Sequence, residues 1–132
     1  MADDGARAVL IVEDSENSAA TLEIALMAIP GLSVMLAPSA VEALRILNRS
    51  TRPVSAVVTD LNMPRMDGFE LIQHIREDHR FDSTPIIVVS ADTDPSTPRR
   101  VAELGASAFF PKPFSPAEVR RKLEQLLDAE LH

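Results

Sequence analysis

Short apolar runs alternate five times with longer segments of helical periodicity along this chain. The runs are rich in β-branched residues, and each is bounded by turn residues or acidic residues, which is typical of β-strands. The predicted strands cover residues 8–12, 32–37, 55–59, 85–89 and 108–110. The fourth run is the most continuously apolar, so we expect that strand to be covered on both faces of a sheet.

Between the runs, apolar residues recur every three to four positions, which predicts amphipathic helices. We expect these five helices at 15–29, from Ser39 past Leu47, after Asp67, from about Pro98 to Leu104, and from Ser115 onward. Ser39 with Glu42 and Asp67 with Glu70 have the spacing of a capping box at a helix start.

Two details of the helices follow from the same pattern. In the second helix, Val41, Leu44 and Leu47 are expected to form the apolar face. The start of the fourth helix stays open, because 94–95 and 97–98 both pair a capping residue with a proline at the first helical position.

The composition limits the class of protein. A chain of 132 residues with 45% hydrophobic content is typical of one domain with its own core. The absence of cysteine fits a reducing compartment and excludes thiol catalysis and thiolate metal sites. The formal charge of −7 argues against direct binding of nucleic acid or of an anionic membrane. The acidic start lacks the features of a signal peptide, so we expect a cytoplasmic protein.

Five strand–helix units predict an α/β fold, a doubly wound five-stranded parallel sheet with helices on both faces. Right-handed crossovers then bring the carboxyl ends of all strands to one edge, where ligands bind in open α/β sheets. The residues expected at that edge are Glu13, Asp14, Asp60, Ser90, Ala91 and Lys112. Three carboxylates with one ammonium call for a further cation, and oxygen ligands with water favour Mg²⁺.

Four segments, IVEDSE, VVTDLNMPRMDGFELI, VVSA and GASAFFPKPF, resemble in order and spacing the response-regulator receiver domain of two-component signalling, close to single-domain chemotaxis-type (CheY-like) receivers. The resemblance covers about residues 8–127 and implies one receiver domain over 1–132. It also implies the flavodoxin-like strand order 2-1-3-4-5, of which a chemotaxis receiver is a known example.

The resemblance implies a role for each residue at the sheet edge. Asp60 would be the phosphoacceptor. The metal ligands for Mg²⁺, or for Mn²⁺ as a substitute, would be Glu13, Asp14, Asp60 and the backbone carbonyl of Asn62. The phosphoryl-binding and switch residues would be Ser90, Ala91, Lys112 and Phe109. Asn62 and Asp92 would tune the phosphoryl lifetime, and the Lys112–Pro113 bond would be cis. Glu13 stands where many receivers carry aspartate, so direct or water-mediated ligation stays open.

The resemblance implies a phosphoacceptor signalling switch and not an enzyme. Its donor would be a sensor histidine kinase or a histidine phosphotransfer protein. Its target would be a separate protein or an output domain absent from this chain, reached through the fourth helix, fifth strand and fifth helix. The alternatives are a phosphorylation-independent interaction module and, less favoured, a phosphohydrolase with an aspartyl nucleophile. Asn62 argues against the hydrolase, since haloacid dehalogenase-like enzymes carry a second aspartate there.

Overall fold

The computed structural model describes residues 7–49 and 54–131 of the chain. In chain order, its elements are β1 (Arg7–Val12), α1 (Glu16–Met27), β2 (Leu32–Ala37), α2 (Ala40–Arg49), β3 (Ala56–Thr59), α3 (Gly68–Glu77), the 3₁₀ helix η1 (His79–Phe81), β4 (Ile86–Ser90), α4 (Thr97–Leu104), β5 (Ala108–Pro111) and α5 (Pro116–Leu131). No helix within this part of the chain is long and apolar enough to cross a bilayer.

The five strands form one parallel sheet in the order β2-β1-β3-β4-β5, which confirms the predicted fold. The register aligns the carboxyl ends of the strands: Val12 lies opposite both Ala37 and Thr59, and Ser90 lies opposite Pro111. The residues that follow these ends are therefore delivered to one edge.

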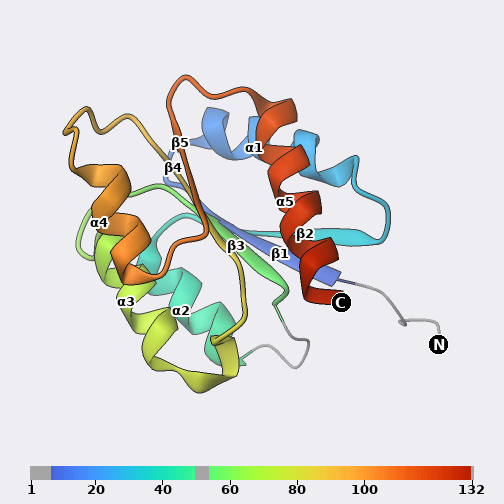
Figure 1. Ribbon diagram of the computed structural model, residues 1–132, viewed down its shortest axis with the longest axis horizontal. Coiled ribbons are helices and arrows are strands. Elements are labelled where there is room, and N and C mark those ends of the chain that lie inside the picture. Colours follow the sequence, from blue (N-terminus) through green and yellow to red (C-terminus); the bar gives the residue numbers. More distant parts are fainter. Residues whose placement is uncertain (1–6, 50–53, 132) are drawn as a thin grey trace.

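Helices cover both faces of the sheet, with α1 and α5 on one face and α2, α3 and α4 on the other (Figure 1). Because side chains alternate along a strand, neighbouring residues enter different cores. Val57 packs with Leu71 and Ile72 of α3, whereas Val58 packs with Leu22 of α1 and Leu123 of α5. All residues of β3 and β4 are buried, as expected for inner strands.

The structure confirms the predicted start of α3 and defines the start of α4, which the sequence had left open. Asp67 and Glu70 form both hydrogen bonds of the predicted capping box of α3. The fourth helix begins at Thr97, with Ser96 as its N-cap and no side-chain capping hydrogen bond, so neither candidate pair supplies the cap. The second pair is displaced by one position, because Thr97 is the first helical residue and Pro98 the second. Thr97 itself is fully buried.

Two features differ from the sequence prediction. Val41 is exposed, and Ala40 and Ala43 are buried against the sheet in its place. The prediction was wrong because it assigned the larger apolar residues to the buried face. Where a helix packs close to a sheet, small residues such as alanine fit between the two. The short helix η1 was also not predicted, because three residues are too few to show a helical period. Asp78 caps this helix by accepting a hydrogen bond from the Arg80 N–H.

Candidate functional site

Glu13, Asp60 and Lys112 each stand one position beyond a strand, and backbone hydrogen bonds hold them there. Asp14 follows Glu13 directly. The Glu13 N–H donates to the Ala37 carbonyl at 3.0 Å, and the Asp60 N–H donates to the Val12 carbonyl at 3.0 Å. The Lys112 N–H donates to the Ser90 carbonyl at 2.8 Å. The sheet pairing thus extends into the site and fixes the backbone of these groups.

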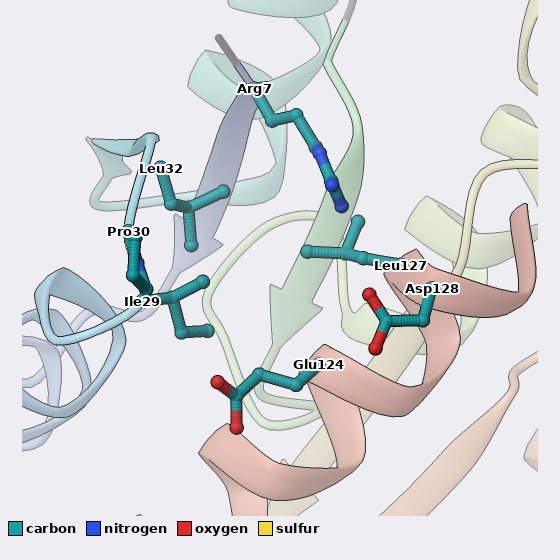
Figure 2. A pocket seen from close by; sticks show the side chains of 7 residues that line it. All are labelled: Arg7, Ile29, Pro30, Leu32, Glu124, Leu127 and Asp128. Carbon is teal, nitrogen blue, oxygen red and sulfur yellow. The ribbon is translucent and has the colours of Figure 1, made fainter. Parts of the chain in front are cut away.

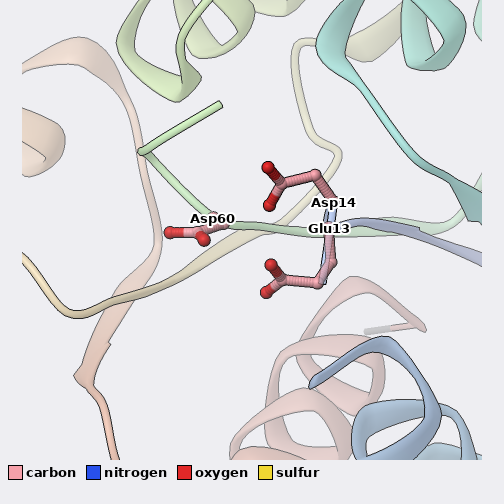
Figure 3. Close-up of side chains that lie close together, drawn as sticks. All are labelled: Glu13, Asp14 and Asp60. Atoms are coloured by element: carbon pink, nitrogen blue, oxygen red, sulfur yellow. The ribbon is translucent and has the colours of Figure 1, made fainter. Parts of the chain in front are cut away.

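Three carboxylates converge at this edge. One oxygen each from Glu13, Asp14 and Asp60 lies within 4.8 Å of the other two (Figure 3). Glu13 and Asp60 are buried and Asp14 is exposed. The cluster is therefore open to water on the Asp14 side and closed by the sheet on the other.

A single ammonium group from the described residues lies among these carboxylates. Lys112 Nζ donates to Glu13 Oε1 at 2.9 Å and to Asp60 Oδ2 at 3.1 Å. Burial lowers the pKa of Lys112, but its hydrogen bond to Glu13 and its contacts with Asp60 outweigh burial and raise the pKa overall. Lys112 is therefore a permanent cation at neutral pH.

The pKa of Glu13 is also raised, and the two shifts describe one imbalance. Burial of the carboxyl group is the largest cause; the bond to Lys112 opposes it, and repulsion by Asp60 adds to it. One ammonium stabilises its own charge between two carboxylates but does not neutralise both. The site therefore has more negative than positive charge.

Hydrogen bonds around Asp60 arrange the loop that follows it. Asp60 Oδ1 accepts from the N–H of Leu61 at 2.6 Å and from the N–H of Asn62 at 3.3 Å. The buried Thr59 hydroxyl donates to the Asp60 carbonyl at 2.8 Å. These bonds leave Oδ2 directed to Lys112.

Gly68 closes this loop because it has no side chain. Its N–H donates to the Leu61 carbonyl at 2.8 Å, and an added Cβ would overlap the Asp60 carbonyl oxygen and lie 2.6 Å from Leu61 Cα. Neither this role of Gly68 nor that of Thr59 was predicted from the sequence. The Asp67-Gly68 pair was the available signal, since glycine beside a turn often marks a close backbone approach.

Of the remaining predicted residues, Ser90 and Ala91 lie at the same edge, whereas Phe109 lies within β5, opposite Val88. Ser90 is fully buried, and its Oγ accepts from the Asp92 N–H at 3.1 Å, which leaves the hydroxyl proton for another acceptor. Ala91 is exposed, and Phe109 is half-buried against the core below α3 and α4. The peptide bond between Lys112 and Pro113 is cis, the isomer that the family resemblance implies.

The donor set fits a hard divalent cation. Carboxylate oxygens without histidine or cysteine are the ligands preferred by Mg²⁺ and Mn²⁺. The excess of negative charge left beside Lys112 is what such an ion would neutralise. We therefore regard Glu13, Asp14 and Asp60 as residues that fit Mg²⁺.

A cavity of about 240 Å³ lies elsewhere, at the end of the sheet where the strands begin (Figure 2). Its lining residues are Arg7, Ile29, Pro30, Leu32, Glu124, Leu127 and Asp128. Arg7 and Leu32 begin their strands, so this cavity is separated from Asp60 by the length of the sheet. It contributes nothing to the carboxylate site.

A five-stranded parallel sheet with three carboxylates and one lysine at the carboxyl ends of its strands is the arrangement of a receiver domain. The family model of the response regulator receiver domain matches residues 9–124, so the chain belongs to this family. It is a receiver domain of two-component signalling, similar to CheY.

Individual relatives agree with this assignment. The chemotaxis protein CheY homolog of Campylobacter jejuni is 29% identical over 119 residues, which cover 90% of this chain and 91% of that protein. The two-component response regulator ORR5 of Oryza sativa is 32% identical, with 93% and 90% covered. The solved structure of chemotaxis response regulator CheY4 of Vibrio cholerae superposes with a TM-score of 0.80 at 28% identity, with 91% and 98% covered.

Proposed function

We propose that Asp60 accepts a phosphoryl group from a phosphohistidine in a Mg²⁺-dependent reaction. The observation that carries this proposal is the contact of Lys112 Nζ with Asp60 Oδ2 at 3.1 Å inside a cluster of carboxylates. A cation at that distance is suited to stabilise the charge of a transferred phosphoryl group. The chain is then a regulatory domain that assists its own phosphorylation and not a turnover enzyme.

In the transfer, the bond between phosphorus and the donor imidazole nitrogen breaks as a bond from phosphorus to an Asp60 oxygen forms. Both electrons of the broken bond remain on the imidazole, which takes up a proton. The ionised Asp60 needs no base, because it is already a nucleophile. Backbone N–H groups of Leu61 and Asn62 hold Oδ1, and the carboxylate is thus oriented for attack.

Glu13, Asp14, Asp60 and the Asn62 carbonyl would hold the metal. A bound Mg²⁺ supplies positive charge to the phosphoryl oxygens and offsets the carboxylates. Lys112 would contact the phosphoryl group, with Ala91 beside it. Glu13 keeps Lys112 in reach through the 2.9 Å bond until phosphate arrives.

Phosphorylation would be sensed by Ser90 and Phe109. A hydrogen bond from the Ser90 hydroxyl to a charged phosphoryl oxygen contributes about 1.5–3 kcal/mol. Reversing a 1:99 equilibrium takes about 5.5 kcal/mol, so Ser90 alone falls short. The remaining bias would come from the transfer of Lys112 from Glu13 to the phosphoryl group, from partner binding, or from an inactive state populated to less than about 99%. Phe109 would follow by a change of rotamer. Asn62 and Asp92 would tune how long the phosphoryl group persists.

The output surface would be α4, β5 and α5. Ser90 precedes α4 in the chain and Lys112 lies between β5 and α5, so a change at either residue reaches these elements directly. Its partners would be a sensor histidine kinase or histidine phosphotransfer protein as donor, and a downstream protein or output domain as target. We also propose that residues 1–132 form a single receiver domain.

The test is intact-mass measurement after treatment with a small acyl phosphate and Mg²⁺. We expect the gain of one acid-labile phosphoryl group, abolished by chelation of the metal and by Asp60→Asn. Asp67→Asn is the matched control, because asparagine also caps a helix and should leave labelling unchanged. Absence of labelling would instead favour a phosphorylation-independent interaction module.

A further inference from the structure

The loop between β4 and α4, residues 91–96, leads from the site edge of the sheet to the first turn of α4 (Figure 1). One kind of hydrogen bond repeats along it. Ser90 Oγ accepts from the Asp92 N–H at 3.1 Å, and Asp92 Oδ1 accepts from the Asp94 N–H at 2.8 Å. Asp94 Oδ1 then accepts from the Ser96 N–H at 2.9 Å. These three links form an unbroken hydrogen-bond ladder from Ser90 to Ser96, the residue before α4.

Asp94 joins the end of this ladder to the start of α4. Its Oδ1 also accepts from the Ser96 hydroxyl at 2.8 Å, and its backbone carbonyl accepts from the Thr97 N–H at 3.1 Å. A helical carbonyl would accept from the residue four positions later, but Pro98 has no N–H. The bonds from Ser96, that of its N–H first, lower the pKa of Asp94, so this acceptor is ionised at neutral pH. Asp94 therefore fixes the place where α4 begins.

Within the described residues, side chains give the first turn of α4 little further support. Ser96 is the N-cap but makes no side-chain capping bond. Thr97 is fully buried, and its Oγ1 has no hydrogen-bond partner in the part of the chain that the structure describes. A buried hydroxyl without a partner disfavours the conformation that leaves it so. The closed first turn therefore depends on the ladder.

The rest of α4 is anchored independently of the ladder. Val101 is buried in the core, and the Arg100 guanidinium lies over the Phe69 ring of α3 at 4.2 Å. These contacts hold the helix to its neighbours through side chains beyond the first turn. Opening at Ser96 and Thr97 can therefore stay local, without release of the whole helix.

We propose that Asp94 is a positioning residue of the switch, which makes closure of the first turn of α4 depend on where the Ser90 hydroxyl lies. None of the roles that the family resemblance implies falls on Asp94. Serine lacks the branch that would hold its χ1, so Ser90 Oγ can turn to a phosphoryl oxygen and give up the Asp92 N–H. The ladder then loses its first link, the turn opens, and the Thr97 hydroxyl reaches water. This inference rests on the proposed function of Asp60.

The first test needs neither metal nor phosphate. Its probe is the amide hydrogen exchange of Arg100, measured by NMR, because the Arg100 N–H donates to the Ser96 carbonyl at 3.0 Å in the first turn. Asp94→Ala should raise this exchange by about fivefold or more, the effect of losing one hydrogen bond. Asp94→Asn keeps an acceptor oxygen and should stay within about twofold of the wild type.

Asp78→Ala is the matched control. Asp78 accepts from the N–H two residues later, that of Arg80, at 3.0 Å in front of η1, so the variant removes a bond of the same kind elsewhere. It should leave the exchange of Arg100 unchanged, and circular dichroism checks that every variant folds. Unchanged exchange in Asp94→Ala, or an equal rise in Asp78→Ala, overturns the proposal.

Coupling to Ser90 is measured by a double-mutant cycle. Ser90→Ala removes the first acceptor of the ladder and should raise the exchange of Arg100 by about threefold. In the Asp94→Ala background the ladder is already broken, so the same change should have no further effect. Equal effects of Ser90→Ala in both backgrounds overturn the proposal.

The second test adds an acyl phosphate and Mg²⁺, with labelling followed by intact mass. The exchange of Arg100 should rise by about threefold in the wild type, as it does in Ser90→Ala, and should not change in Asp94→Ala. A labelled wild type with unchanged exchange overturns this inference and leaves the proposed function intact. Absence of labelling contradicts the proposed function instead, and the double-mutant cycle then decides alone whether Asp94 couples Ser90 to α4.

Discussion

Lys112 Nζ lies 3.1 Å from Asp60 Oδ2, although 52 residues separate the two along the chain. The contact exists because β3 and β5 end at the same edge of a parallel sheet, with β4 between them. The same ammonium also lies 2.9 Å from Glu13, which follows β1. One side chain thus joins the ends of three strands and holds the charge balance of the site.

Replacing Lys112 with glutamine should destabilise the metal-free protein by about 1–3 kcal/mol, because two buried carboxylates lose a charged donor. The measurement is urea unfolding followed by circular dichroism, since the chain has neither tryptophan nor tyrosine as a fluorescent reporter. Lys122→Gln on α5 is the control and should change stability by no more than about 0.5 kcal/mol. Equal stability of the two variants would show that Lys112 does not neutralise the cluster.

Replacing Glu13 with glutamine should have the opposite sign without metal and raise stability by about 1 kcal/mol. Burial raises the pKa of Glu13 in the folded state, so the folded protein holds this proton more tightly than the unfolded chain. Stability from that proton is present at low pH and is lost as pH rises through the folded pKa. At neutral pH the ionised group is therefore a cost that glutamine removes.

The Glu13→Gln variant should also gain less stability from Mg²⁺ than the wild type, because the metal relieves a smaller excess of charge. Thermal unfolding with and without Mg²⁺ measures both effects. Glu16→Gln, an exposed change in the first turn of α1, is the control. A metal-free Glu13→Gln protein less stable than the wild type would contradict the charge-balance account.

The fold class and the shared edge of Asp60 and Lys112 follow from strand periodicity and crossover handedness, whereas the strand order 2-1-3-4-5 was implied by the family resemblance alone. Hydrogen bonds from side chains to backbone groups cannot be predicted in the same way. The Thr59 hydroxyl bonds the Asp60 carbonyl, yet nothing distinguishes Thr59 from any other strand threonine. Val41 was misplaced for a related reason, since periodicity alone does not report how closely α2 approaches the sheet.

Arg76 is the clearest contact that the sequence did not predict. Its guanidinium donates to the Phe81 carbonyl at 2.6 Å, to the Thr84 carbonyl at 2.7 Å and to the Gly105 carbonyl at 2.9 Å. Arg76→Met should therefore cost about 2–4 kcal/mol, because several half-buried carbonyls lose their donor together.

Arg76→Lys should restore little of this loss, since an ammonium does not reproduce the planar fork of donors. Urea unfolding measures both variants. Arg45→Met, which removes an exposed pair with Glu42, should stay within about 0.5 kcal/mol of the wild type. If Arg76→Lys equals the wild type, charge alone and not the fork geometry accounts for the contact.

Gly68→Ala should impair the site more than it impairs the fold. The added methyl group would overlap the Asp60 carbonyl oxygen and crowd Leu61 Cα, so the loop that carries Asn62 must move. We expect a loss of about 2 kcal/mol in stability and at least a tenfold slower phosphorylation by an acyl phosphate. Gly31→Ala separates the two effects, because Gly31 has a φ of 76° at the opposite edge of the sheet, where alanine costs about 1–2 kcal/mol. That variant should lose stability and keep its phosphorylation rate. Equal slowing in both would mean that the rate reports general loosening and not the close approach of Gly68 to Asp60.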